Sequence, residues 1–270
     1  MKKNLFSTLI ALFIVNILLA KIAVFTPVKV EKKDIEQFLN VETNYSKKIA
    51  QDAVNKDKLV GWALLQNTNP GPDDYNFIWV NIYPDINTAA NENTWWNNSE
   101  VVVGIKPDVL FSDSSKYKYD RSYTYKMEMT IPNSAPAAYV ILNFTSPDDV
   151  DAAIASAEKY VLPHFKKNMD DHGMVGWGMA TKITPQGQDY SSVMFYDSYD
   201  TLANAMRHLA GESVMKGLPF DKIEKSTWEM RPSMKVISST TEKNKDSIYP
   251  KKLIQHFLWD SSSEEWVYLK

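Results

Sequence analysis

The chain has 270 residues, of which 44% are hydrophobic and 12% aromatic, so it can bury a substantial core and is not intrinsically disordered. Its formal net charge of -3 gives no electrostatic footprint for nucleic acid, and we expect no nucleic-acid partner. The absence of cysteine excludes both a disulfide framework and a lipidated cysteine.

The N-terminus has the pattern of an export signal. Lys2 and Lys3 precede an apolar run from Leu5 to Ala20, which matches the basic and apolar regions of a signal peptide in order. The run is shorter than the about 20 residues that a membrane-spanning helix needs, although residues 22–25 would lengthen it in an uncleaved anchor. We therefore expect cleavage after Ala20, no stable membrane span in the mature chain, and a periplasmic or extracellular location.

The next part of the chain alternates between strand and helix patterns. Ile22 to Val30 is rich in β-branched residues, and the following stretch places Ile35, Phe38 and Ile49 at helical spacing. The turn-forming run Asn67 to Asp74 separates two further strands. We expect a strand at 22–30, an amphipathic helix from 32, strands at 58–65 and 75–83, a short helix after 85, and a strand at 122–131.

The second part of the chain repeats this order. Ser146 is a capping residue, Pro147 suits a first helical turn, and Asp148 and Asp149 favour the positive end of the helix dipole. We expect a strand at 138–144, a helix from 146, strands at 174–181 and 190–196, a helix after 200, and a strand near 227–230. The tail from Lys235 has no counterpart in the first part.

Two short motifs indicate an internal duplication. Leu59 to Trp62 resembles Met174 to Trp177, and each motif leads into an Asp-Tyr pair, Asp74-Tyr75 in one case and Asp189-Tyr190 in the other, at a constant offset of 115 residues. Each unit reads strand, helix, strand, strand, helix, strand, which is the ferredoxin-like order. Because such a sheet carries helices on one face only, the other face must be buried by a second sheet.

These patterns predict an α+β fold with two tandem ferredoxin-like units whose antiparallel sheets pair as an intramolecular α/β barrel. Since the second sheet comes from the same chain, we expect a monomer with pseudo-two-fold symmetry. The predicted divisions are a signal peptide at 1–20, a first unit at 21–134, a second unit at 135–232 and a C-terminal extension at 233–270.

The motifs at Leu59 to Trp62 and Asp74 to Tyr83, with their counterparts at Met174 to Trp177 and Asp189 to Tyr196, resemble the dimeric α/β-barrel superfamily. The resemblance is greatest to exported bacterial proteins that carry two such domains in tandem. It implies a ligand cavity between each sheet and its helices or the opposing sheet. The superfamily includes monooxygenases, haem-degrading enzymes, haem proteins similar to chlorite dismutase, and isomerases, so haem is one cofactor that it suggests. Fold analogy alone assigns no activity.

The strand at 75–83 has one aromatic face, which we interpret as a ligand-binding wall. Aliphatic residues at 78, 80 and 82 occupy the other face, and we expect these to pack against helices. Rings with a few hydroxyl and amide groups suit a flat, partly polar ligand, although they would equally suit plain inter-sheet core. The predicted ligand-binding residues are Tyr75, Phe77, Trp79, Asn81 and Tyr83, together with Tyr190, Ser192, Met194 and Tyr196.

His164 is the candidate catalytic residue. It lies one helical turn after Tyr160 beside an apolar stripe, and the resemblance implies such a histidine in haem-binding relatives, although the matching residue in the first unit is Ile49. The alternative is a partly buried histidine with a local hydrogen bond. No compact cluster of metal ligands is found in the sequence, so we expect no metal site.

Two functions remain open at this point. One is an exported enzyme or carrier that acts on a small aromatic or tetrapyrrole-like ligand in a barrel cavity. The other is a non-catalytic exported scaffold or partner-binding protein whose barrel is solid core. A cavity of roughly several hundred Å³ would distinguish the first from the second.

Overall fold

The computed structural model describes residues 20–91, 94–212, 214–225, 227–243, 257–260 and 265–268. The expected signal peptide therefore lies outside the described residues except for Ala20. Within the described residues, no helix is both long and apolar enough to cross a membrane.

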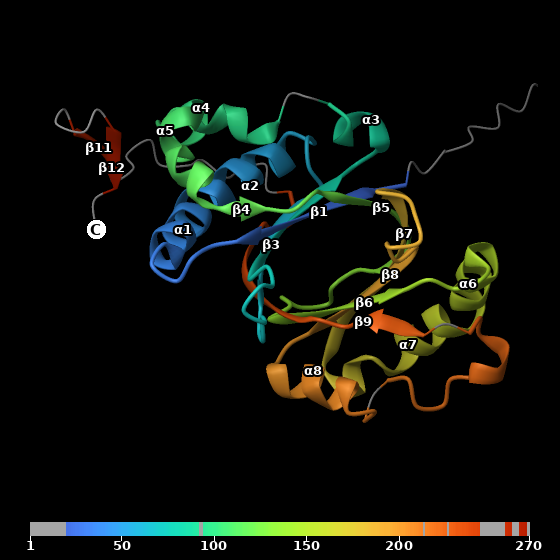
Figure 1. Cartoon of the computed structure of the whole chain (residues 1–270). Coiled ribbons are helices and arrows are strands. Elements are labelled where there is room, and N and C mark those ends of the chain that lie inside the picture. The colour runs from blue at the N-terminus through green and yellow to red at the C-terminus, as the bar shows by residue number, and fades with distance from the viewer. Residues whose placement is uncertain are drawn as a thin grey trace, which may run out of the picture.

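Eight antiparallel strands form a closed barrel, which confirms the predicted mixed α+β barrel (Figure 1). Around the barrel the strands follow the order β10-β2-β3-β1-β5-β7-β8-β6, and pairing of β10 with both β2 and β6 closes the ring. The strands are β1 (Ile22–Lys29), β2 (Gly61–Asn67), β3 (Phe77–Tyr83), β5 (Tyr123–Ile131), β6 (Tyr139–Thr145), β7 (Met174–Thr184), β8 (Val193–Tyr199) and β10 (Ser233–Ser239).

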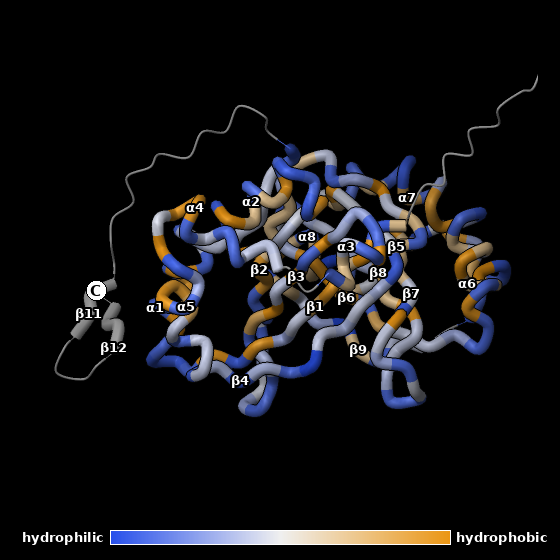
Figure 2. The backbone as a smooth tube through the Cα atoms, turned by 90° about the horizontal axis from the view of Figure 1, so that it is seen from above, coloured by the Kyte–Doolittle hydropathy of each residue, from blue (hydrophilic) through white to orange (hydrophobic). Residues whose placement is uncertain are grey.

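The strands fall into two sets with the same neighbour order. The first half of the chain supplies β2-β3-β1-β5 and the second half supplies β7-β8-β6-β10. Each half covers its outer sheet face with a long helix that includes a π-helical turn, and Figures 1 and 2 show these two helices on opposite sides of the barrel. In the first half the segments are α1 (Ile35–Val41), the π-turn Glu42–Ser46 and α2 (Lys47–Asn55); in the second half they are α6 (Val150–Ser156), the π-turn Ala157–Val161 and α7 (Leu162–Asn168).

Shorter elements complete the described fold. In the first half they are α3 (Ile86–Ala89), α4 (Ser99–Val103), α5 (Pro107–Leu110) and β4 (Lys118–Tyr119), and in the second half α8 (Leu202–Leu209) and β9 (Trp228–Met230). Strands β11 (Phe257–Asp260) and β12 (Glu265–Tyr268) pair with each other in a separate small sheet.

The barrel interior is packed with apolar side chains, and the two outer helix layers form separate cores. In β3 the faces are the reverse of the prediction: Val80 points into the barrel, whereas Phe77 and Trp79 pack beneath the helices. The interior of an eight-stranded barrel is just wide enough for side chains to fill it. In β3 the barrel side is aliphatic, and rings from other strands, such as Phe25, Tyr125 and Tyr196, help to fill the interior.

The last barrel strand begins later than predicted. The predicted strand near residues 227–230 exists as β9, but it pairs only with the end of β6 and its three residues are exposed. Strand β10 occupies the first part of the segment that we expected to be a C-terminal extension. Its residue Met234 is buried in the barrel interior, and β10 joins the two halves by pairing with β2 and β6. Pairing with both β2 and β6 thus places the last barrel strand at 233–239.

Candidate functional site

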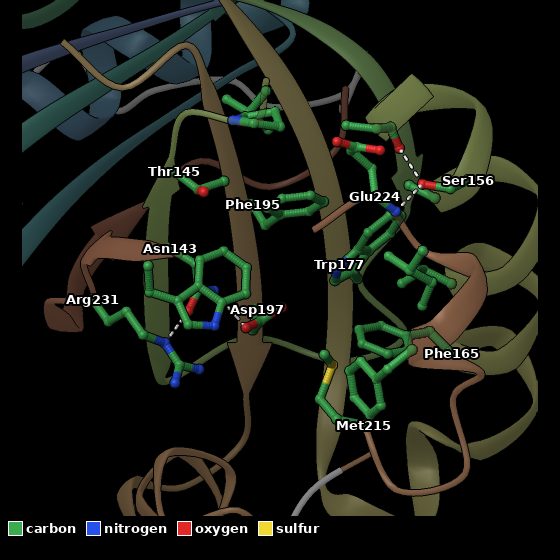
Figure 3. A pocket seen from close by; sticks show the side chains of 18 of the residues that line it. Asn143, Thr145, Ser156, Phe165, Trp177, Phe195, Asp197, Met215, Glu224 and Arg231 are labelled. Carbon is green, nitrogen blue, oxygen red and sulfur yellow. Dashed lines mark hydrogen bonds between the residues drawn. The ribbon is translucent and has the colours of Figure 1, made fainter. Parts of the chain in front are cut away.

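A cavity of about 690 Å³ lies in the second half, between the outer face of the sheet and the helices (Figure 3). This volume is within the range of small-molecule sites. Strands β6, β7 and β8 form its floor, α6 and α7 form one wall, and the segment between α8 and β9 covers it. The lining residues are Asn143, Thr145, Pro147, Ala153, Ser156, Ala157, Val161, Phe165, Trp177, Val193, Phe195, Asp197, His208, Leu209, Gly211, Met215, Lys216, Phe220, Ile223, Glu224, Lys225, Trp228 and Arg231.

Aromatic rings form a continuous row along the cavity. The centroids of Phe165 and Trp177 are 5.4 Å apart, and those of Trp177 and Phe195 are 6.1 Å apart. Phe195 in turn meets Trp228 edge-on at 5.7 Å. Such a row offers faces and edges to a flat ring-containing molecule.

The covering segment is held on the helices by two hydrogen bonds. The ring Nε2 of His164 lies 2.7 Å from the backbone oxygen of Val214, and the backbone N–H of Glu224 donates to the Ser156 hydroxyl at 3.2 Å. A carbonyl can only accept, so the His164 proton in this bond is on Nε2. His164 of α7 therefore holds the segment that contains Val214 against the cavity.

Small side chains on the helices account for part of the space in this cavity. The two π-helical turns start at Glu42 and Ala157, so they are offset by the same 115 residues as the sequence motifs. At this offset the cavity residues Ala153, Ser156 and Ala157 correspond to three first-half residues, Phe38, Val41 and Glu42. Each second-half residue is the smaller one.

The sheet side shows the same difference in size. Trp62 of β2 pairs with Asn81, and the corresponding Trp177 of β7 pairs with Asp197, so β3 and β8 correspond at an offset of 116. By this register Val193 stands in the place of Phe77, and Phe195 in that of Trp79. The equivalent first-half space is reduced to a cavity of about 30 Å³, bordered by Phe38, Val41, Glu42 and Trp79 among others. That space has room for one or two water molecules.

A chain of polar side chains closes one end of the cavity. The Asn143 amide donates to Asp197 Oδ2 at 2.6 Å, and His208 Nε2 lies 3.2 Å from the same oxygen. The Arg231 Nε–H donates to Asn143 Oδ1 at 2.7 Å, as Figure 3 shows. Asp197 and His208 are only 3% and 6% exposed, so this pair is buried in the wall. Burial, and after it the nearby carboxylate of Asp197, raises the pKa of the Tyr199 hydroxyl.

The nine predicted ligand-binding residues do not lie together. None of them lines the 690 Å³ cavity. Phe77, Trp79 and Tyr83 belong to the helix-side core of the first half, and Met194 and Tyr196 belong to the barrel interior. The remaining four are placed as follows: Asn81 accepts from the Trp95 indole N–H at 3.0 Å, the Tyr190 hydroxyl accepts from Arg121 at 2.6 Å, and Tyr75 and Ser192 precede β3 and β8.

The Trp79 indole N–H donates to the Glu42 carboxylate at 3.0 Å. Glu42 is 4% exposed, and its burial raises the pKa of this carboxyl to about 7. The expected ligand wall of the first half is therefore a packed layer with an internal acid. No sequence pattern predicted the true cavity residues of β6 and the covering segment; the small residues of α6, compared with Phe38 and Glu42, are the signal that could have located the cavity.

Neither a protein-family profile nor a curated protein matches the chain. The structure is similar to that of a proposed monooxygenase from Fusobacterium nucleatum subsp. nucleatum ATCC 25586, with 11% identity and a TM-score of 0.53 over 87% of this chain and 99% of that chain. A proposed monooxygenase from Lactobacillus acidophilus NCFM has 13% identity and a TM-score of 0.50 over 83% and 97%. A haem-binding protein from Thermus thermophilus has 8% identity and a TM-score of 0.48 over 80% and 91%. At these identities the likeness shows the fold alone, and it supports the predicted dimeric α/β-barrel fold.

Haem, which the fold family suggests, does not fit the histidines of this cavity. His164 is not among the lining residues, and its Nε2 is engaged with Val214. His208 Nε2 faces Asp197, while its Nδ1 has no hydrogen-bond partner and is buried away from solvent. The one histidine that lines the cavity therefore exposes neither imidazole nitrogen to an iron, since Nε2 contacts Asp197 and Nδ1 is buried. Among the described residues there is also no group of three or more histidine, cysteine or acidic side chains that could hold a metal ion.

Proposed function

We propose that the protein binds a small organic molecule with a flat, largely apolar ring system in the second-half cavity. The observation that carries this proposal is the 690 Å³ space lined by a row of rings, with a polar chain at one end. Pockets for organic ligands combine apolar walls with a few placed polar groups in this way. The ligand would lie between the sheet and α6, outside the barrel.

Fluorescence titration with a neutral two-ring probe, naphthalene-2-carboxamide, tests this proposal. Trp177 and Trp228 line the cavity, so a bound ring compound should change their emission. Saturable one-site binding supports the proposal, and isothermal titration calorimetry gives the stoichiometry. The packed barrel interior excludes the barrel cavity that the sequence predicted, so the ligand site is the helix-side cavity. Absence of saturable binding by this probe and by related ring compounds would favour the alternative, a non-catalytic scaffold or partner-binding protein.

Oxidation of the bound ring compound is a second candidate function. It is supported by the two structural neighbours that are named as proposed monooxygenases. Asp197 and His208 are buried and contact each other, and Asp197 also accepts from Asn143, so we assign this pair no chemical step. Oxygen consumption on addition of a hydroxylated naphthalene, measured with an oxygen electrode, would support this function, and a zero rate would leave binding alone.

We also propose that the chain consists of two tandem ferredoxin-like units, one at 21–134 and the other from 135 through β10. The matching strand orders and the paired π-turns support this division. Because β5 pairs with β7 and β10 pairs with β2 within one chain, the barrel needs no second copy, and we propose a monomer. A dimer of constant mass at all concentrations in analytical ultracentrifugation would contradict this.

Export is a further proposal, supported by Lys2, Lys3 and the apolar run to Ala20. Cell fractionation with N-terminal sequencing should recover a periplasmic or secreted chain that begins at Lys21. Full-length protein in the cytoplasm would refute export, and membrane-bound protein that retains Met1 would show an anchor.

A further inference from the structure

Arg231 is fixed at the polar end of the cavity by two neighbours. Its Nε–H donates to Asn143 Oδ1 at 2.7 Å, and its guanidinium carbon lies 5.3 Å from the centre of the Trp228 ring. Asn143 is itself held, since its amide group donates to Asp197. The plane of the guanidinium group is therefore set before any ligand enters.

The outer edge of this guanidinium group is unused by the protein. Arginine has five N–H donors, and the bond to Asn143 takes the one on Nε. Among the described residues, no hydrogen bond or ion pair engages the two terminal nitrogens of Arg231. The buried carboxylate of Asp197 contacts Asn143 and His208 and does not pair with Arg231. A planar fork with free donors matches the two oxygens of a carboxylate.

The charges around the cavity favour the same kind of ligand. Arg231, Lys216 and Lys225 line it as cations, while Asp197 and Glu224 line it as anions. These five side chains leave one positive charge without a negative counterpart. A ligand with one negative charge would balance the site, whereas a cationic ligand would not.

We propose that the ligand is a planar aromatic carboxylate, with its carboxylate on the terminal nitrogens of Arg231 and its ring along Phe195 and Trp177. Arg231 is then the residue that recognises the ligand, and Asn143 and Trp228 position it. This inference rests on the proposed binding function and adds the chemical class of the ligand. Figure 3 shows Arg231 on the opposite side of the cavity from Phe165, so the two ends of such a molecule meet different chemistry.

A matched pair of ligands tests the inference on the full chain. Naphthalene-2-carboxylate and naphthalene-2-carboxamide have the same rings and nearly the same shape, but only the first is ionised at pH 7. Hydrogen bonds between charged groups contribute enough for us to expect the wild type to bind the carboxylate about 10- to 100-fold more tightly than the amide. Arg231→Gln should abolish this preference and leave amide binding unchanged within about threefold.

Two further variants control for charge and folding. Arg231→Lys keeps the charge but loses the planar fork, so part of the preference should remain. Lys225→Gln removes an exposed charge at the same cavity and should leave most of the preference intact. Equal affinities for the two compounds in wild type, or a preference that survives in Arg231→Gln, would overturn the inference while the binding proposal stands. If neither compound binds, both proposals fail.

Discussion

Ala153→Phe would give the open cavity the side chain that the closed half has at the equivalent position, Phe38. The cavity has about 690 Å³, and a space of about 150 Å³ accommodates one benzene ring. The new ring can therefore enter existing space, and the usual overpacking cost of about 1 to 3 kcal/mol should not apply. The free energy of unfolding should stay within about 0.5 kcal/mol of wild type, the usual range for a change that creates no strain.

Ligand binding should suffer instead. Burial of a ring-sized apolar group is worth about 1.5 to 3 kcal/mol. A ligand denied that part of the cavity should lose about 2 kcal/mol, which is about thirtyfold in Kd. Adding Val193→Phe, the counterpart of Phe77, should reduce binding further, because a second ring fills the floor of the same space.

The assay is fluorescence titration with naphthalene-2-carboxamide, which is neutral and so does not depend on Arg231. The matched control is Ala155→Phe, which places the same ring on the exposed face of the same helix. Wild-type affinity in Ala153→Phe would refute the cavity as the binding site. An equal loss in both variants would show that the effect comes from the helix and not from filling the cavity.

Three further substitutions test the packing. Glu42→Gln should remove a pH dependence of stability. Because burial raises the folded-state pKa of Glu42 to about 7, the wild-type fold is stabilised below pH 4.5, and this stabilisation is lost as the pH rises through 7. Urea melts at pH 4.5 and pH 8 should therefore show that the free energy of unfolding of wild type falls by about 3 kcal/mol more than that of the variant. Trp79→Ala should cost about 3 kcal/mol and Val80→Ala about 2 kcal/mol in the same melts, because the half-buried Trp79 ring packs against Phe38 and its N–H binds Glu42. A smaller loss for Trp79 than for Val80 would contradict this placement. Asp197→Ala should cost about 1 to 3 kcal/mol, because the buried Asn143 amide and His208 lose the acceptor that they share, and a loss below about 0.5 kcal/mol would show that these contacts contribute little.

The order of strands and helices could be predicted because it depends on local patterns. Alternation located β3 to within two residues. The helix predicted from Ser146 begins at Val150, because Asp149 and not Ser146 is the N-cap and accepts from the Ala152 N–H. The strand at 190–196 was placed three residues too early, since β8 covers Val193–Tyr199. An offset of 115 accounts for only one of these three residues, because it holds for β2 and β7 but is 116 for β3 and β8.

A shift of one residue reverses the two faces of a strand. At an offset of 115, Trp79 matches Met194, which points into the barrel, whereas the register of the sheet matches it with Phe195, which lines the cavity. The aromatic face was therefore assigned to the wrong side, and residues from both sides were combined into one site. No local pattern in β3 distinguishes barrel interior from helix layer, because both are apolar. Only the pairing of Trp62 with Asn81 and of Trp177 with Asp197 fixes the correspondence.

The difference between the halves also bears on stability. Phe38 and Phe77 are buried in the first half, and full burial of each such ring is worth about 1.5 to 3 kcal/mol. The second half has Ala153 and Val193 in their places and gives up several kcal/mol of this burial, which is a large part of the about 5 to 15 kcal/mol that keeps a domain folded. Strand pairing of β5 with β7 and of β10 with β2 joins both halves into one sheet, so the open half cannot unfold without breaking the barrel of the closed half. The packed first half thereby contributes stability that lets the second half keep its cavity.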